Sequence, residues 1–188
     1  SKLLSDTTNG YNWDVRTNGN ATKAQILEAI AQYAQEVGED GTLGFYVSGH
    51  GSSDGKFMTA NGMLSFSEVT DKIVSVRSTP LKLLLTFNDS CYSGHWVDGN
   101  GALPTDKNFD WSIVANGPLY YERLSDEELN ERVNMTVNEV VKAFSAVQGR
   151  ANGIEQFFVM AAAKKTQTSL DYGSQYGGIF TYKLRTIY

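Results

Sequence analysis

The sequence predicts a single α/β domain in which helices cover a mostly parallel sheet, and three observations lead to this prediction. Segments with apolar residues at helical spacing alternate along the chain with short apolar runs of strand length. One such run, residues 81–87, is apolar on both faces, as expected of a central parallel strand. A chain of 188 residues with a hydrophobic content of 41% suits one sizeable core.

The first helix is expected to begin after Thr22, because Thr22 and Gln25 have the spacing of a capping box. Apolar residues then recur at helical spacing as far as Val37, and Gly38 is expected to end the helix. Residues 42–48 predict a buried strand that runs directly into a glycine-rich loop, residues 49–55.

A second capping box, formed by Ser65 and Glu68, predicts a short helix that extends to about Val76. Pro80 cannot continue a helix, so the apolar run that follows it is expected to be the next strand, residues 81–87.

Residues 96–121 are rich in Gly, Asn, Asp and Pro and predict a long surface loop. A third capping box at Ser125 and Glu128 predicts a helix whose apolar stripe reaches Val147 and which Gly149 caps.

The last third of the chain is expected to contain one more strand, residues 157–163, and then a polar loop, residues 164–175. A final helix is expected to begin near Gly177.

The composition argues against several classes of partner. The formal net charge is −5 and no basic stripe is present, so neither nucleic acid nor an anionic membrane is an expected partner. No run of about 18 apolar residues predicts a membrane span, and the first residues lack the features of a signal peptide. A single cysteine cannot form an internal disulfide, which favours a reducing compartment and therefore a cytoplasmic location.

The chemistry is expected where two strands end. Sites in parallel sheets lie beyond the carboxyl ends of the strands, and His50 and Cys91 each follow one predicted strand. A thiol becomes a strong nucleophile when a nearby imidazole takes its proton. The N–H groups of Gly51 and Cys91 could together hold a developing oxyanion. The pattern predicts acyl transfer with Cys91 as nucleophile and His50 as base.

Each of these residues, taken alone, has a simpler explanation. A lone cysteine after a strand is usually a small buried hydrophobic residue, and a lone histidine in a loop is usually solvated. His95, four positions after Cys91, is an alternative base. The combination of S-G-H-G after one strand and D-S-C-Y-S-G after the next favours the catalytic interpretation.

Those two motifs, residues 48–51 and 89–94, resemble the motifs of the caspase-like cysteine peptidases, the superfamily of caspases, metacaspases, legumains, clostripains and gingipains. Residues 157–169 and the G-G-I-F-T-Y run from Gly177 are similar to the third strand, Q-T-S loop and G-x-F-T helix of metacaspases and their bacterial relatives. The resemblance spans roughly residues 20–187. It implies a caspase-like three-layer sandwich and a cysteine endopeptidase that acts on proteins or peptides.

The chain departs from that family in three places. Residues 1–20 are polar, so the first strand of the family is expected to be missing, and the chain stops early in the expected last helix. Residues 96–150 exceed a minimal link and are expected to be an insertion. The chain is therefore expected to be a processed or trimmed product.

The resemblance also implies a specificity. The residue two positions before the nucleophile helps to line the pocket for the residue that precedes the cleaved bond (P1), and here it is Asp89. A carboxylate favours cleavage after Arg or Lys, as in metacaspases, and Asp171 could add a second carboxylate. In the alternative, Asp89 caps the Cys91 turn through backbone N–H groups.

No cofactor is expected, although some metacaspases require calcium and the chain has acidic candidates for a calcium site. The candidates are Asp54, Asp98, Asp106, Asp110 and residues 126–128. None of these segments has EF-hand spacing, and the carboxylates of residues 126–128 are explained by favourable electrostatics in the first turn of a helix. A zinc site is less expected still, because the chain has one cysteine and two histidines.

A peptidase that cleaves after Arg or Lys could also cleave its own chain after exposed basic residues. Lys107 and Arg123 lie in or beside the long polar segment after Cys91, so the parent protein is expected to be a zymogen that cuts itself after Lys107 and before Ser1. Another fragment of the same parent is then an expected partner. The alternatives are a chain boundary unrelated to processing, another P1 specificity, ligase activity, and a non-catalytic scaffold.

Overall fold

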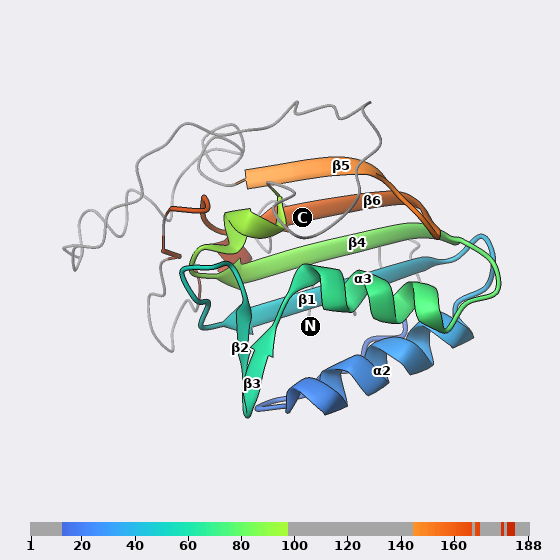
Figure 1. Ribbon diagram of the computed structural model, residues 1–188, viewed down its shortest axis with the longest axis horizontal. Helices are drawn as coiled ribbons and strands as arrows, with labels where there is room; N and C mark the ends of the chain where they lie inside the picture. Colours follow the sequence, from blue (N-terminus) through green and yellow to red (C-terminus); the bar gives the residue numbers. More distant parts are fainter. Residues whose placement is uncertain (1–12, 98–144, 167, 170–177, 179, 183–188) are drawn as a thin grey trace.

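The computed structural model describes residues 13–97, 145–166, 168–169, 178 and 180–182 (Figure 1). All elements named below lie within these ranges. They are α2 (Lys23–Glu36), β1 (Thr42–Gly49), β2 (Phe57–Thr59), β3 (Gly62–Leu64), α3 (Phe66–Ser75), β4 (Leu81–Ser90), the 3-10 helix η2 (Ser93–Trp96), β5 (Ser145–Ala151) and β6 (Ile154–Ala161).

The main sheet has the strand order β1-β4-β6-β5. β4 pairs in parallel with β1 on one side and with β6 on the other, whereas β5 is antiparallel to β6. Figure 1 shows α2 and α3 side by side next to the β1–β4 part of the sheet. Their buried residues join those of the strands in one core, for example Ile30 of α2, Ile73 of α3 and Leu84 of β4. The predicted α/β fold with a mostly parallel sheet is confirmed.

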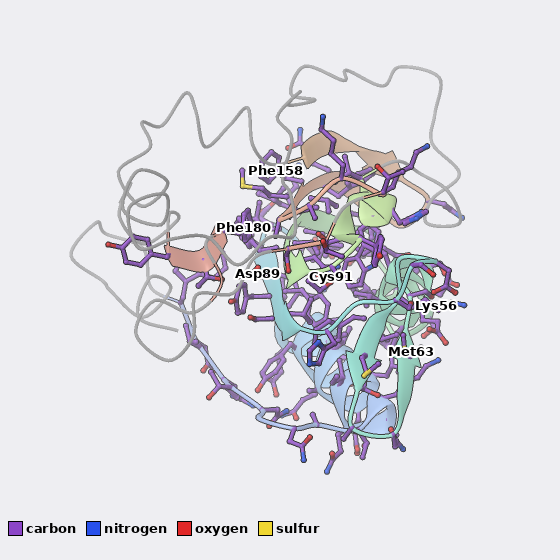
Figure 2. The ribbon with its side chains drawn as sticks, turned by 90° about the vertical axis from the view of Figure 1, so that its left-hand side faces the viewer. Lys56, Met63, Asp89, Cys91, Phe158 and Phe180 are labelled. Atoms are coloured by element: carbon purple, nitrogen blue, oxygen red, sulfur yellow. The ribbon has the colours of Figure 1, made fainter. Side chains whose placement is uncertain are left out.

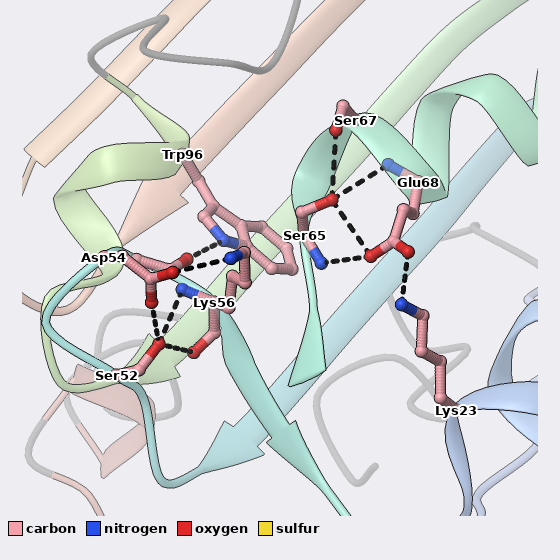
Figure 3. Close-up of polar contacts among 9 residues, drawn as sticks. Lys23, Ser52, Asp54, Lys56, Ser65, Ser67, Glu68 and Trp96 are labelled. Carbon is pink, nitrogen blue, oxygen red and sulfur yellow. Dashed lines mark hydrogen bonds and ion pairs between the residues drawn. The ribbon is translucent and has the colours of Figure 1, made fainter. Parts of the chain in front are cut away.

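Both capping boxes predicted for the first two helices are present. Thr22 caps α2 with Gln25 as its reciprocal partner, and Ser65 caps α3 with Glu68 in the same role. Glu68 also forms an ion pair with Lys23, which ties the start of α3 to the start of α2 (Figure 3). α2 ends one residue before its C-cap, Val37, so the predicted end near Gly38 is close to the observed one.

The helix predicted to reach Val147 is wrong over its last part. Residues 145–151 form the edge strand β5, and Gly149 pairs with Phe157 rather than capping a helix. The physical reason is a tight turn at Asn152 and Gly153, where Gly153 has a φ of +76°, a conformation that favours glycine. The turn folds the segment back on β6, and strand pairing then outweighs helical spacing of the apolar residues.

A short antiparallel hairpin, β2–β3, follows the glycine-rich loop and was not expected from the sequence. It carries Phe57 and Leu64 into the core and presents its backbone to the loop that contains His50. At the other end of the chain, the Tyr182 N–H donates to the Gly178 carbonyl at 2.9 Å, so the predicted last helix does begin here.

Several predictions lie outside the described residues. They are the predicted 96–121 loop from residue 98 onwards, the predicted helix from Ser125 as far as residue 144, the cleavage sites Lys107 and Arg123, the carboxylate of Asp171, and the acidic residues 98, 106, 110 and 126–128. The first residue of that predicted loop, Trp96, instead lies in η2 and is buried, because its indole packs in the core. Among the helices that the structure describes, none has both the length and the apolar character needed to cross a membrane.

Candidate active site

The pairing of β1 with β4 brings the two candidate catalytic residues to the same edge of the sheet. The strands are in register with Gly49 opposite Ser90, so His50 and Cys91 are the next residues on adjacent parallel strands. His50 is exposed and Cys91 is half-buried. Figure 2 shows Cys91 at this end of the sheet, together with Asp89.

Gly51 is in close contact with the backbone of Cys91. A Cβ atom at Gly51 would lie 2.9 Å from the Ser90 Oγ and 3.1 Å from the Cys91 carbonyl carbon, and nearer still to the Cys91 carbonyl oxygen. Real Cβ atoms essentially never approach below 3.0 Å, so only glycine fits here without a shift of one strand end. The first residue after the candidate base therefore touches the candidate nucleophile.

The hairpin holds the His50 loop without using the Gly51 N–H. Gly51 forms an isolated antiparallel bridge with Phe57. The Met58 N–H donates to the His50 carbonyl at 2.8 Å, and the Ser52 N–H donates to the Lys56 carbonyl at 2.9 Å. Both bonds of the bridge thus use the neighbours of Gly51, and its own N–H takes no part in the hairpin.

The chain turns sharply directly after Cys91. Tyr92 has a φ of +56°, in the left-handed region that few residues other than glycine adopt, and η2 begins with the next residue. Ser93 is fully buried and its Oγ accepts a hydrogen bond from the Ala163 N–H at 3.1 Å. The serine of the D-S-C-Y-S-G motif therefore fixes the turn to the end of β6.

Gly94 completes that attachment. A Cβ atom at this position would lie 2.7 Å from the Ala163 carbonyl oxygen and would overlap the backbone of Lys164 and Lys165. The close approach of two backbones explains why a glycine follows the serine in this motif.

Asp89, at the end of β4, is buried and belongs to a polar network. Its residue surface is 3% exposed, and its Oδ2 accepts hydrogen bonds from both the N–H and the Oγ1 of Thr181. The Tyr46 hydroxyl lies 2.6 Å from the same Thr181 Oγ1. A Cβ atom at Gly178 would lie 2.8 Å from the Asp89 Cγ, so the start of the last helix packs directly on this carboxylate.

The network changes the acidity of Tyr46. Although 38% of the residue is exposed, burial of its hydroxyl raises the pKa above the ordinary value of 10.0. Hydrogen bonds with Ser48 and Thr181 lower the pKa and the negative charge of Asp89 raises it, but burial has the largest effect.

Ser169, in the loop after β6, is a neighbour of Cys91 that the sequence did not single out. The Cys91 Sγ lies 4.0 Å from the Ser169 Oγ. The only signal in the sequence was the Q-T-S run that contains Ser169, and a run of that kind does not say which residue it meets.

The alternative base, His95, lies in η2. A Cβ atom on Gly55 would overlap the His95 side chain, so His95 packs against the loop that follows His50. Asp54 in that loop accepts hydrogen bonds from Ser52 and Lys56, and the Lys56 ammonium in particular lowers the pKa of Asp54 to about 2 (Figure 3). Asp54 was one of the carboxylates considered for calcium, and these contacts give it a structural role within the loop.

A comparison with protein families connects this geometry with known proteins. The model of the caspase domain family matches residues 1–188. No curated protein and no solved structure matches the chain.

Proposed function

The chain belongs to the caspase domain family and is a caspase-like cysteine peptidase, and from this premise we propose that it is an endopeptidase that cleaves after Arg or Lys with a His50–Cys91 dyad. The observation that carries the proposal is the register of β1 with β4, which makes His50 and Cys91 adjacent positions at one sheet edge. The left-handed conformation of Tyr92 adds support, because it turns the chain out of the strand direction directly after the thiol.

In the proposed reaction His50 takes the proton of the Cys91 thiol, and the thiolate attacks the carbonyl carbon of the cleaved bond. The C–N bond then breaks, and the His50 imidazolium gives its proton to the leaving amine. Water hydrolyses the resulting thioester with His50 again as base, which regenerates the thiol and releases the new carboxylate.

The oxyanion of both steps is assigned to the N–H groups of Gly51 and Cys91. The Gly51 N–H suits this role because the hydrogen bonds to the hairpin are made by the His50 carbonyl and the Ser52 N–H instead. The contact between Gly51 and the Cys91 carbonyl group also keeps the two residues close together. Fixed donors of this kind need no reorganisation as the charge develops, and each contributes roughly 3–4 kcal/mol.

The P1 preference is assigned to Asp89. It precedes Cys91 by two positions at the end of β4, and its carboxylate is buried against the start of the last helix. Thr181 holds that carboxylate in one orientation through two hydrogen bonds. A buried, oriented carboxylate favours a guanidinium or an ammonium over a neutral or acidic side chain.

A panel of fluorogenic peptides that differ only in P1 tests the proposal, with Arg, Lys, Asp and Ala at that position. We expect cleavage of the Arg and Lys peptides and none by the Cys91→Ala variant. Equal cleavage of the Asp and Arg peptides would overturn the P1 assignment. Cleavage by Cys91→Ala would overturn the assignment of the nucleophile.

A basic preference extends to the chain itself, and we propose that the parent protein processes itself after Lys107. Intact-mass analysis of the full-length parent and its Cys91→Ala form tests this. A fragment that ends at Lys107 is expected from the parent alone. Identical fragments from both proteins would show that another peptidase makes the cut.

A further inference from the structure

The two segments that leave the sheet after His50 and after Cys91 meet again at Trp96 and Gly55. Trp96 lies five residues after Cys91, and Gly55 lies five residues after His50. The indole Nε1–H of Trp96 donates a hydrogen bond to the Gly55 carbonyl at 2.7 Å, and this bond is buried. Figure 3 shows the indole next to the loop that carries Ser52, Asp54 and Lys56.

The indole is itself held by the core. Trp96 is 3% exposed and stacks on Phe66 of α3 with a centroid distance of 5.2 Å and an interplanar angle of 22°. Its ring also lies nearly parallel to Phe45 of β1, at 6.3 Å and 8°. A ring packed between a helix and a strand cannot follow a moving loop, so the N–H group is a fixed point.

The loop that accepts this hydrogen bond behaves as one unit. The Gly55 N–H donates to the Ser52 carbonyl at 2.8 Å, and the Ser52 N–H donates to the Lys56 carbonyl at 2.9 Å. Gly55 has a φ of +78°, and a Cβ atom there would overlap the His95 side chain. A displacement of the Gly55 carbonyl therefore moves residues 52–56 together, and Gly51 and His50 lie directly before them.

We propose that Trp96 is a positioning residue for the reaction, because its N–H fixes the His50 loop relative to the Cys91 turn. The inference rests on the proposed dyad. If Trp96 served only to fill the core, its ring would be enough. A buried indole N–H needs a hydrogen-bond acceptor, but that acceptor need not be the Gly55 carbonyl. The position of the partner on the His50 loop gives the N–H a second role: together with the Gly51–Cys91 contact, it sets the distance between base and nucleophile.

Two variants remove the N–H group. Trp96→Phe replaces the bicyclic indole with a smaller phenyl ring. 3-Benzothienylalanine at position 96 keeps the shape of the indole but carries sulfur in place of N–H. The matched control is Lys56→Ala, which breaks the exposed ion pair with Asp54 in the same loop and leaves the indole bond intact. His50→Ala supplies the reference for a thiol without its base.

The readouts are kcat and KM for an Arg peptide, the rate of Cys91 alkylation by iodoacetamide at about pH 6.5, and the melting temperature. We expect the benzothienyl variant to lose roughly ten- to a hundredfold in kcat with KM nearly unchanged, because misplaced catalytic groups slow chemistry more than binding. Its alkylation rate should fall towards that of His50→Ala, while its melting temperature falls by only a few degrees, the expected effect of one buried carbonyl left without its donor. Lys56→Ala should match the parent in all three.

Two outcomes separate the inference from the proposed function. If His50→Ala alters alkylation but the benzothienyl variant keeps the kcat and alkylation rate of the parent, the role of Trp96 is refuted and the dyad stands. If His50→Ala leaves alkylation unchanged, the dyad is refuted and the positioning role with it. The isosteric variant decides the question even if Trp96→Phe does not fold.

Discussion

Replacing Gly51 with Ala tests the contact on which the geometry of the site depends most. The new Cβ atom would lie 2.9 Å from the Ser90 Oγ and 3.1 Å from the Cys91 carbonyl carbon, whereas ordinary contact begins at 3.4 Å. The end of β1 must therefore move from the end of β4 by at least about 0.5 Å, and by more to clear the Cys91 carbonyl oxygen. Alanine keeps the N–H group, so the change displaces the proposed oxyanion donor without removing it.

We expect kcat/KM for an Arg peptide to fall by roughly a hundredfold or more in Gly51→Ala, since a misplacement of about 1 Å has that effect. The free energy of unfolding should fall by about 1–3 kcal/mol from overpacking. Gly62→Ala is the matched control, because a Cβ atom there would meet only the Thr59 Oγ1, at 4.0 Å. If Gly51→Ala retained kcat/KM within about threefold of the parent, the close contact and the oxyanion assignment would both be wrong.

Two further predictions concern Asp89 and its network. Asp89→Asn keeps the shape of the side chain and removes its charge, so kcat/KM for Arg and Lys peptides should fall by the equivalent of about 2–5 kcal/mol; an unchanged ratio of Arg to Ala cleavage would contradict the assignment. Burial raises the pKa of Tyr46, so the native protein keeps this proton at pH values where the unfolded chain has lost it. The stability of the parent should therefore decline as the pH rises above 10.0, and Tyr46→Phe should lack that part of the decline in urea unfolding; identical pH dependence of the two proteins would contradict this origin of the shift.

Local signals predicted the elements that place the site. The capping boxes at Thr22 and Ser65 defined the starts of two helices within one residue. The apolar runs predicted β1 and β4, and with them the placement of His50 and Cys91 after two parallel strands. Such signals succeed because capping bonds and strand burial depend on residues close together in the sequence.

The segment around Val147 shows where local reasoning failed. Its apolar spacing extended a helical pattern by coincidence, whereas the turn at Asn152 and Gly153 decides the structure by folding residues 145–151 onto β6. An Asn-Gly pair between two apolar runs is a strong hairpin signal and could have predicted this strand.

The contacts around the candidate active site could not be predicted in the same way. Thr181 reaches Asp89 across 92 positions, Ser169 reaches Cys91 across 78, and the Trp96 indole reaches the Gly55 carbonyl across 41. The residues next to each of them in the sequence do not predict its partner, because the contact forms only when the strands of the sheet have paired. The family resemblance indicated the motifs, and the fold shows which residues surround them.

The central claim is that Cys91 reacts with His50 as its base, and the most direct measurement compares His50→Ala with His95→Ala. The assay is covalent labelling of Cys91 by a peptide with a P1 Arg and an electrophilic carbonyl, followed by intact mass. We predict that the parent and His95→Ala are labelled at similar rates, and that His50→Ala is labelled more slowly by several orders of magnitude. Normal labelling of His50→Ala together with loss of labelling in His95→Ala would contradict the account.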